Sequence, residues 1–281
     1  MAEIIDGKKI AAEVREGIKK ETEILAGKGK QPGLAAVLVG ENPASVIYVR
    51  NKRKACEKVG IYSEEHKLAE NTSQEDLLAL IRKLNHNPRI HGILVQLPLP
   101  DHLDTEKILY AISPDKDVDG LHPFNIGHLT MGDPIFVPCT PSGVMVMLDY
   151  HKIPIEGKKA VIVGRSNLVG RPVALLLMHR HATITICHSR TPDIAAVCRE
   201  ADILVAAIGK PGFITGDMVK EGAAVIDVGI NRKEDGGLVG DVDYDSASKK
   251  AGWITPVPGG VGPMTIALLL KNTLESAKRM K

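Results

Sequence analysis

Apolar positions in the first half of the chain follow two spacings, one typical of amphipathic helices and one typical of buried strands. Ile10, Val14 and Ile18 share one face of a helix. Residues 34–39 and 93–95 are short apolar runs, as expected for strands that are buried on both faces. Further helices are expected over residues 45–59, after Pro43, and around Leu77, Ile81 and Leu84. The order of these elements predicts βα units.

The alternation begins again near residue 160. Strands are expected at residues 160–163, 183–187, 203–207 and 223–228, with helical or turn segments between them. Two sets of βα units predict an α/β protein in which two βα domains flank a cleft, the C-terminal one Rossmann-like. We expect the first domain at residues 1–138 and the second at residues 139–264, with a C-terminal helix, 265–281, packing back onto the first.

Composition argues against several classes of function. A chain of 281 residues, 44% of them hydrophobic, can bury the cores of two domains. The chain has 36 basic and 34 acidic side chains, so its net charge is only +2. Nucleic-acid binding is therefore not expected. No apolar run approaches the roughly 18 to 20 residues that span a bilayer, and the first residues lack a secretory signal pattern. We therefore expect a cytoplasmic protein without membrane contact.

Cysteines and histidines do not follow a metal-binding pattern. The four cysteines lie far apart without a C-x-x-C pair, which favours reduced thiols over disulfides or a zinc site. His179 and His181 lack a nearby carboxylate or cysteine at ligand spacing. No metal is expected, and neither His122 nor His188 receives a role.

The turn at residues 163–170 connects a predicted strand to a predicted helix, and it favours a dinucleotide. Gly164 and Gly170 would let the backbone approach a pyrophosphate at the start of the helix. The next strand ends at His188, Ser189 and Arg190 rather than at the carboxylate that holds the ribose of NAD. The fork of Arg165 and the hydroxyl of Ser189 would suit a 2′-phosphate, so NADP is the expected cofactor. An ordinary strand-to-helix connection is the alternative, since G-x-G-x-x-G is incomplete.

Another candidate site lies in the first half of the chain. Tyr48 and Lys52, at positions i and i+4, share one face of the predicted helix. Gln96 follows the strand at 93–95, and the segment Asp117-Val118-Asp119-Gly120 lies farther along. In open α/β sheets, ligands bind beyond strand ends, where these residues could converge. Taken singly, each is also compatible with a solvated helix face or a turn.

Several blocks of sequence together resemble the bifunctional methylenetetrahydrofolate dehydrogenase/cyclohydrolase family. These blocks occur in order at residues 48–52 (YVRNK), 95–100 (VQLPLP), 116–120 (KDVDG), 138–141 (PCTP), 164–166 (GRS) and 258–265 (PGGVGPMT). The resemblance covers nearly the whole chain. It implies oxidation of 5,10-methylenetetrahydrofolate with NADP⁺, followed by hydrolysis of the methenyl product to 10-formyltetrahydrofolate, as part of one-carbon metabolism.

The resemblance also implies roles for individual residues. Lys52 corresponds to the catalytic lysine, Gln96 to its partner, Tyr48 to an aromatic wall over the folate, and Asp119 to the carboxylate that holds the pterin. The remaining folate contacts would be Val95, Leu97, Pro258, Gly259, Gly260, Val261 and Gly262. The NADP contacts would be Gly164, Arg165, Ser166, Ser189 and Ile230. A homodimer is implied as well.

Two other interpretations use the same residues. Tyr48 and Lys52 fit the Y-x-x-x-K pair of a short-chain dehydrogenase, although in that family the glycine motif precedes the tyrosine, whereas here Gly164 follows it. The second alternative is a non-catalytic NADPH-sensing protein. Such a protein would bind the dinucleotide without oxidising or reducing a substrate.

Overall fold

The computed structural model describes residues 2–233 and 235–280, which form two compact units. The six-stranded unit comprises residues 2–11 and Thr140–Thr265. The three-stranded unit comprises Ala12–Cys139 and residues 266–280. Two long helices, α1 (Gly7–Gly27) and α10 (Val261–Arg279), therefore contribute residues to both units.

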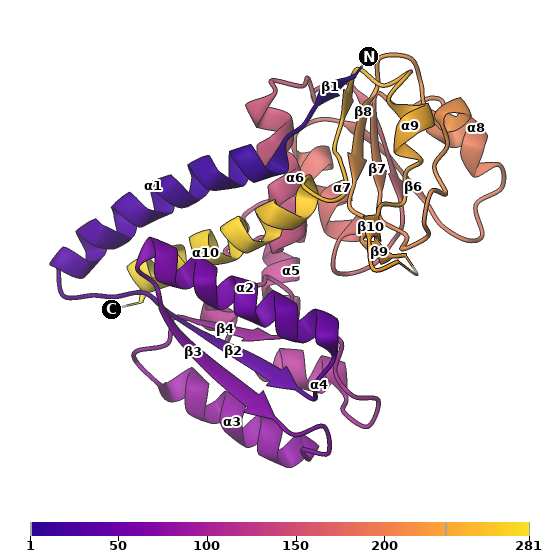
Figure 1. The fold of residues 1–281 in the computed structure, drawn as a ribbon. Helices are drawn as coiled ribbons and strands as arrows, with labels where there is room; N and C mark the ends of the chain where they lie inside the picture. Colours follow the sequence, from indigo (N-terminus) through magenta and orange to yellow (C-terminus); the bar gives the residue numbers. More distant parts are fainter. Residues whose placement is uncertain (1, 234, 281) are drawn as a thin grey trace. The chain divides into compact units, whose positions relative to one another are not determined.

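A parallel sheet with the order β3-β2-β4 forms the centre of the three-stranded unit. Its strands are β2 (Gly33–Val39), β3 (Tyr62–Leu68) and β4 (Gly92–Val95). Helix α2 (Pro43–Val59) covers one face, and α3 (Gln74–His86) with α4 (Thr105–Tyr110) covers the other (Figure 1). Val37 packs toward α3 and Leu38 toward α2, which explains why β2 is apolar at every position. A short 3-10 helix (Pro114–Lys116) and α5 (Pro123–Met131) complete the unit.

Helix α2 has a defined start and end. The side chain of Asn42 accepts hydrogen bonds from the backbone N–H groups of Ala44 and Ser45, and Pro43 occupies the first turn, where its missing N–H costs nothing. Gly60 ends the helix in the left-handed conformation, with a φ of 78°. These caps fix which residues of α2 face the sheet.

In the six-stranded unit, all neighbouring strands of the sheet run parallel, in the order β1-β11-β8-β7-β5-β6. The strands are β1 (Glu3–Ile4), β5 (Lys159–Val163), β6 (Thr183–Cys187), β7 (Ile203–Ala206), β8 (Ala224–Asp227) and β11 (Trp253–Ile254). The chain moves from β5 to one neighbour, β6, and then crosses to the other, β7. This reversal is the topological switch point at which Rossmann-type sheets bind ligands beyond the carboxyl ends of the strands.

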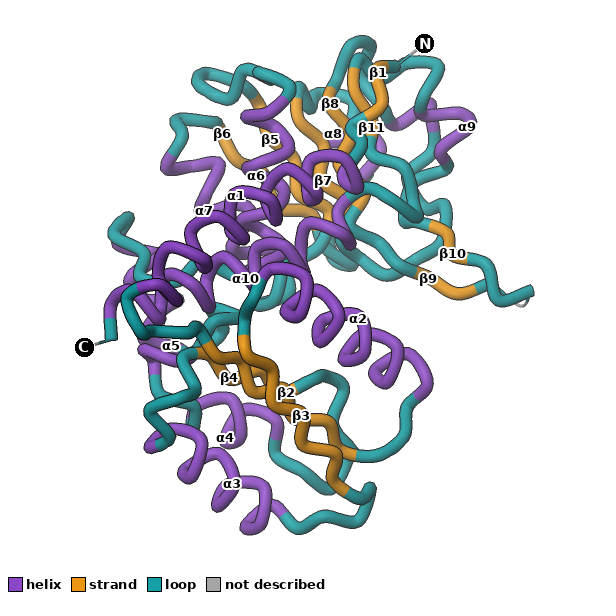
Figure 2. Tube along the Cα trace, turned by 60° about the vertical axis from the view of Figure 1, so that its left-hand side comes forward, coloured by secondary structure: helices purple, strands orange, loops and turns teal. Residues whose placement is uncertain are grey.

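Helices and a hairpin complete the six-stranded unit (Figure 2, where helices are purple and strands orange). They are α6 (Cys139–Tyr150), α7 (Gly170–His179), α8 (Ile194–Cys198), a 3-10 helix (Gly216–Met218), α9 (Tyr244–Ala247) and the antiparallel strands β9 (Asn231–Arg232) and β10 (Leu238–Val239). Val161, Leu204 and Val225 from three central strands pack in one core with Cys198 of α8 and Ala247 of α9. Within residues 2–233 and 235–280, no helix combines the length and apolarity that crossing a membrane requires.

The α/β class and the strands expected at residues 34–39, 93–95, 160–163 and 183–187 are confirmed within a residue or two. The pattern missed β3, because its Ser63–Lys67 stretch is polar, as is common on an edge strand. The structure also differs from the expected first domain at its N-terminus. Ile4 of β1 pairs with Ile254 of β11, so residues 2–11 lie in the six-stranded unit. A two-residue strand is too short to produce a detectable pattern.

Candidate functional site

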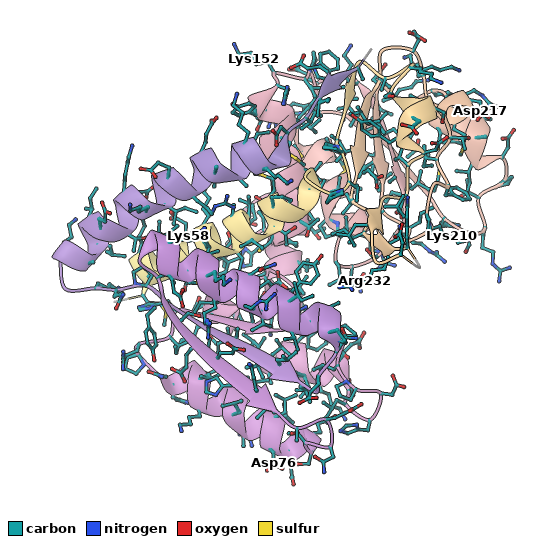
Figure 3. The ribbon with its side chains drawn as sticks, in the orientation of Figure 1. Lys58, Asp76, Lys152, Lys210, Asp217 and Arg232 are labelled. Atoms are coloured by element: carbon teal, nitrogen blue, oxygen red, sulfur yellow. The ribbon has the colours of Figure 1, made fainter. Side chains whose placement is uncertain are left out.

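Lys52 is the most unusual polar residue of the three-stranded unit. It lies in the middle of α2, and only 8% of it is exposed. Its Nζ donates a hydrogen bond to Oε1 of Gln96 at 3.0 Å. The Gln96 amide in turn donates through Nε2 to the carbonyl of Leu97 at 2.7 Å, which fixes the amide with its oxygen toward Lys52. Lys58, labelled in Figure 3, lies on the same helix but is exposed.

Burial lowers the pKa of Lys52, because removing the ammonium from water favours the neutral amine. The negative charge of Asp119 opposes this shift, and weaker contributions from Cys139 and Cys56 act in the same direction as Asp119. A hydrogen bond to an amide oxygen does not by itself favour the neutral form. Gln96 therefore orients the amine, while burial lowers its pKa.

The segment from Lys116 to Asp119 contains three charged residues with different functions. The Lys116 amine is buried and donates to the carbonyls of Leu84 and Asn87, at the end of α3. Asp117 is also buried, and burial raises its pKa, although hydrogen bonds from Asn125 and from backbone N–H groups oppose the shift. Both residues hold the loop. Only Asp119 is half-buried and acts electrostatically on Lys52.

Helix α10 anchors this loop through a residue that the sequence did not single out. Asn272 donates from Nδ2 to the carbonyls of Val118 and Val137, at 2.8 and 3.1 Å. The Cys139 thiol donates to the same Val118 carbonyl at 3.3 Å. Asn272 therefore restrains the residue directly before Asp119. Asn272 lies between Lys271 and Thr273 in the polar half of α10, so the sequence gave no signal of this contact.

Three other predicted folate contacts lie around Lys52 and Gln96. Tyr48 is half-buried and one helical turn before Lys52, so the two side chains share a face of α2. Leu97 is half-buried. Val95 is only 3% exposed, and its side chain belongs to the core beneath the sheet. Only the backbone of Val95 is therefore placed to contact a ligand.

In the six-stranded unit, the glycine turn after β5 is shaped by close backbone approaches. Gly164 has a φ of +126°, and a Cβ there would lie 2.1 Å from the carbonyl oxygen of Ala207. A Cβ on Gly170 would lie 2.2 Å from the carbonyl oxygen of Gly164. Ser166 Oγ accepts from the N–H groups of Val169 and Gly170, at 3.2 and 3.4 Å, so its hydroxyl hydrogen is left to donate. The glycines are thus required by the turn itself, before any ligand is considered.

Arg165 and Ser189 occupy equivalent positions just beyond the ends of the neighbouring strands β5 and β6. Val163 pairs with Cys187 at the end of the two strands. Arg165 and Ser189 each lie two positions beyond this pair, and both are exposed. His188 Nδ1 accepts from the N–H of Arg190, so this ring stabilises the turn. His122 has a comparable structural contact, since its Nδ1 accepts from the N–H of Phe124 at the start of α5.

The glycine-rich loop at residues 258–262 belongs to the six-stranded unit, whereas Lys52, Gln96 and Asp119 belong to the three-stranded unit. Within its own unit the loop lies beside Ile230, because a Cβ on Gly262 would be 3.6 Å from Cδ1 of Ile230. The loop also packs against the start of α1, where a Cβ on Gly7 would lie 1.8 Å from the carbonyl oxygen of Gly260. Sequence reasoning missed Gly7, since a glycine near a helix start has no distinctive pattern.

Among the residues described, all four cysteines are free and buried. The same part of the chain contains no group of three or more His, Cys, Asp or Glu side chains that could hold a metal ion. The polar groups described above are a buried amine, an amide and a carboxylate in the three-stranded unit, and a basic strand end in the six-stranded unit.

A parallel sheet with a switch point and a tight glycine turn places this chain among proteins with a Rossmann-type dinucleotide-binding unit. Comparison with known families is more specific. The chain belongs to the tetrahydrofolate dehydrogenase/cyclohydrolase family: residues 5–119 match its catalytic domain, and residues 138–281 match its NAD(P)-binding domain.

Relatives are similar over almost the whole chain. The bifunctional protein FolD of Moorella thermoacetica is 66% identical over 278 residues, covering 99% of both chains. The crystal structure of the bifunctional enzyme FolD-methylenetetrahydrofolate dehydrogenase/cyclohydrolase from Campylobacter jejuni has a TM-score of 0.97 and 52% identity, with 99% of each chain covered. The methylenetetrahydrofolate dehydrogenase-cyclohydrolase of Trypanosoma brucei, in complex with NADP cofactor and an inhibitor, has a TM-score of 0.96 and 44% identity, covering 99% of this chain and 98% of that one.

Proposed function

We propose that this protein oxidises 5,10-methylenetetrahydrofolate to 5,10-methenyltetrahydrofolate with NADP⁺, and then hydrolyses the product to 10-formyltetrahydrofolate. Family membership over both halves of the chain supports both activities. The observation that carries the proposal is the buried amine of Lys52, bonded to Gln96 and under the charge of Asp119. A lysine kept from water in this way gives up its proton more readily than an exposed lysine, which suits it to acid–base chemistry.

Hydrolysis of the methenyl group needs a base and then an acid. In our proposal, neutral Lys52 accepts a proton as water attacks the methenyl carbon, forming the C–O bond. It returns the proton to the departing ring nitrogen when the C–N bond breaks, while the hydroxyl group of the intermediate releases its own proton to water as the C=O bond of the formyl group forms. Gln96 holds the amine in one orientation through both transfers. Because burial lowers the pKa of Lys52, preparing the neutral base costs less free energy than it would for an exposed lysine.

Oxidation depends more on positioning than on acid–base chemistry. Bound NADP⁺ supplies the hydride acceptor at its nicotinamide ring. Positive charge develops on the folate as hydride leaves, so a fully charged Lys52 would oppose the step, whereas a neutral amine would not. The lowered pKa of Lys52 therefore favours both reactions.

We assign NADP binding to residues at the carboxyl ends of β5, β6 and β8. Arg165 and Ser189 are exposed beyond paired strand ends, and both can donate to a 2′-phosphate. Ser166 retains a free hydroxyl hydrogen for a phosphate oxygen, and Gly164 provides the close turn. Ile230 is 45% exposed after β8 and offers an apolar surface to the cofactor.

We assign folate binding to the residues around Lys52 and to the loop beside Ile230. Asp119 is the proposed partner of the pterin, since a carboxylate can accept from the amino group and the adjacent ring N–H together. Tyr48 would stack on the flat part of the substrate. Val95 and Leu97 would contribute backbone and apolar contacts, as would Pro258, Gly259, Gly260, Val261 and Gly262.

Quaternary state, cellular location and domain roles are further parts of the proposal. We infer a homodimer, as expected for this family, and size-exclusion chromatography with light scattering would measure it. Free, buried cysteines support a reducing, cytoplasmic environment. We assign the folate chemistry to the three-stranded unit, which differs from the domain expected at residues 1–138 with the helix 265–281 mainly in lacking residues 2–11, and NADP to the six-stranded unit.

One coupled assay tests the proposed function. Adding 5,10-methylenetetrahydrofolate and NADP⁺ to the protein should produce NADPH, followed by absorbance by 10-formyltetrahydrofolate in place of the methenyl form. A non-catalytic NADPH-sensing protein would bind NADPH and produce neither change. NADPH formation without methenyl hydrolysis would restrict the function to the dehydrogenase.

A further inference from the structure

A carboxylate buried in the six-stranded unit binds three consecutive backbone N–H groups. Asp241 is 0% exposed. Its Oδ2 accepts from the N–H groups of Ile208 and Gly209 at 2.7 and 2.9 Å, and its Oδ1 accepts from the N–H of Lys210 at 2.9 Å. Hydrogen bonds to a charged acceptor are the stronger ones, so this side chain fixes the backbone after β7.

Asp241 also holds the segment after β8. Nδ2 of Asn231 donates to its Oδ1 at 2.9 Å. A Cβ on Gly229 would lie 2.3 Å from the Asp241 carboxylate, so the backbone on the other side of Ile230 is also packed against it. Ile230 therefore lies between Gly229 and Asn231, both of which contact the buried carboxylate of Asp241.

A second carboxylate holds Asp241 itself. Asp227, at the end of β8, accepts from the backbone N–H groups of Asp241 and Val242, each at 2.9 Å. A Cβ on Gly240 would lie 1.8 Å from Asp227 Oδ2, so the backbone just before Asp241 packs closely against the end of β8. Asp241 is thus restrained through both its backbone and its side chain.

The two loops lie at the part of the sheet where a dinucleotide would bind. Residues 207–210 follow β7, and residues 228–231 follow β8, on the side of β5 away from β6. Arg165 and Ser189 mark the β6 side for the 2′-phosphate, so the nicotinamide half would extend across the switch point toward β7 and β8. The Ala207 carbonyl also approaches Gly164, which couples the loop after β7 to the glycine turn.

We propose that Asp241 is a positioning residue for the dehydrogenase step, which fixes the loops at residues 207–210 and 229–231 on which the nicotinamide half of NADP rests. This inference depends on the proposed dehydrogenase function. Asp241 itself is buried and acts through the backbone of these loops. Cyclohydrolase chemistry uses Lys52 in the other unit and consumes no NADP, so it should not require Asp241.

The test is Asp241→Asn in the full-length protein, with both activities measured. The amide has one oxygen to accept hydrogen bonds, and its NH2 group would face N–H donors at the other position. We expect kcat/KM for NADP⁺ to fall about 100-fold, mainly through a higher KM and a higher Kd for NADPH, as a misplacement of about 1 Å can cause. Hydrolysis of added methenyltetrahydrofolate should stay within about twofold of wild type, since it needs no NADP contact. Asp245→Asn, an exposed carboxylate nearby, is the matched control and should change neither activity.

The outcomes separate this inference from the function on which it depends. Unchanged NADP⁺ kinetics in Asp241→Asn would overturn it, whereas wild-type protein without NADPH formation would instead contradict the proposed function. Asp241→Asn could lose both activities together with its cooperative unfolding. In that case Asn231→Ala tests the inference, because it removes a single side-chain hydrogen bond to Asp241 and leaves the carboxylate in place. A raised KM for NADP⁺ with normal hydrolysis supports the inference, and equal effects on both activities overturn it.

Discussion

Lys52 Nζ donates to Gln96 Oε1 at 3.0 Å from a position where the lysine is 8% exposed. A buried ammonium ion is unfavourable unless it is paired, and here the hydrogen-bond acceptor is a neutral amide rather than a carboxylate. The arrangement keeps the amine oriented without stabilising its charge as an ion pair would. This combination of burial and orientation supports the proton-transfer role that we propose for Lys52.

Replacing that amide with a carboxylate should change the pH dependence of hydrolysis. Gln96→Glu places a negative charge next to the amine, which favours the ammonium form and raises the pKa of Lys52. We therefore expect cyclohydrolase activity at neutral pH to fall about 100-fold and to recover partly as the pH rises, in line with the usual size of acid–base contributions. Stopped-flow or steady-state decay of methenyltetrahydrofolate from pH 6 to 10 measures this change. Gln31→Glu, at an exposed position, is the control.

The buried amine should also lower the stability of the protein in a pH-dependent way. The folded pKa of Lys52 is lowered from 10.5, so between the two values the folded protein binds fewer protons than the unfolded chain. Stability therefore rises with pH across that window, and burial of the charge is most costly below it. We expect Lys52→Met to be more stable than wild type in urea at neutral pH, with a difference that shrinks as the pH approaches 10.5. A constant difference, or the same behaviour in the exposed control Lys54→Met, would contradict this account.

Asp119 should contribute to folate binding. Asp119→Asn removes one acceptor and the charge opposite the pterin, at a cost of about 1.5 to 3 kcal/mol for a hydrogen bond to a charged group. This corresponds to a KM for methylenetetrahydrofolate that is about 10 to 100 times higher. The control is Asp115→Asn, an exposed carboxylate in the same segment. If folate affinity and both rates survive in Asp119→Asn, the assigned role is incorrect.

Arg165 should discriminate between the two dinucleotides. Arg165→Ala removes a donor to the 2′-phosphate, which NAD⁺ lacks. We expect kcat/KM for NADP⁺ to fall about 10- to 100-fold while the value for NAD⁺ changes little, since charged hydrogen bonds contribute about 1.5 to 3 kcal/mol. Initial rates with both dinucleotides measure the ratio, with the exposed Arg199→Ala as control. Equal losses for NADP⁺ and NAD⁺ would show that Arg165 does not recognise this phosphate.

The sequence predicted residues whose position follows from the local pattern. Tyr48 and Lys52 were expected on one helical face, and α2 has the caps and register that place them there. Gln96 was expected just beyond a buried strand, where it meets Lys52. Strand ends in a parallel sheet share an edge, so pairing of such residues follows once helix and strand are assigned.

Contacts between distant segments could not be predicted from the sequence. The Asp-Val-Asp-Gly segment gave no reason to separate Asp117, which holds its own loop, from Asp119, which acts on Lys52. Asn272 reaches Val118 across 154 positions of the chain, and Asp241 reaches Ile208 across 33. A local pattern has no information about such partners, because each depends on how whole elements pack.

The most direct test of the central claim is Lys52→Met, assayed separately for NADPH formation and for methenyl hydrolysis. Met retains a long apolar side chain but cannot carry a proton. We predict that hydrolysis falls by a factor of about 10² to 10⁴, while NADPH formation from methylenetetrahydrofolate persists, because hydride transfer needs no proton acceptor. Hydrolysis at the wild-type rate in Lys52→Met would contradict the account.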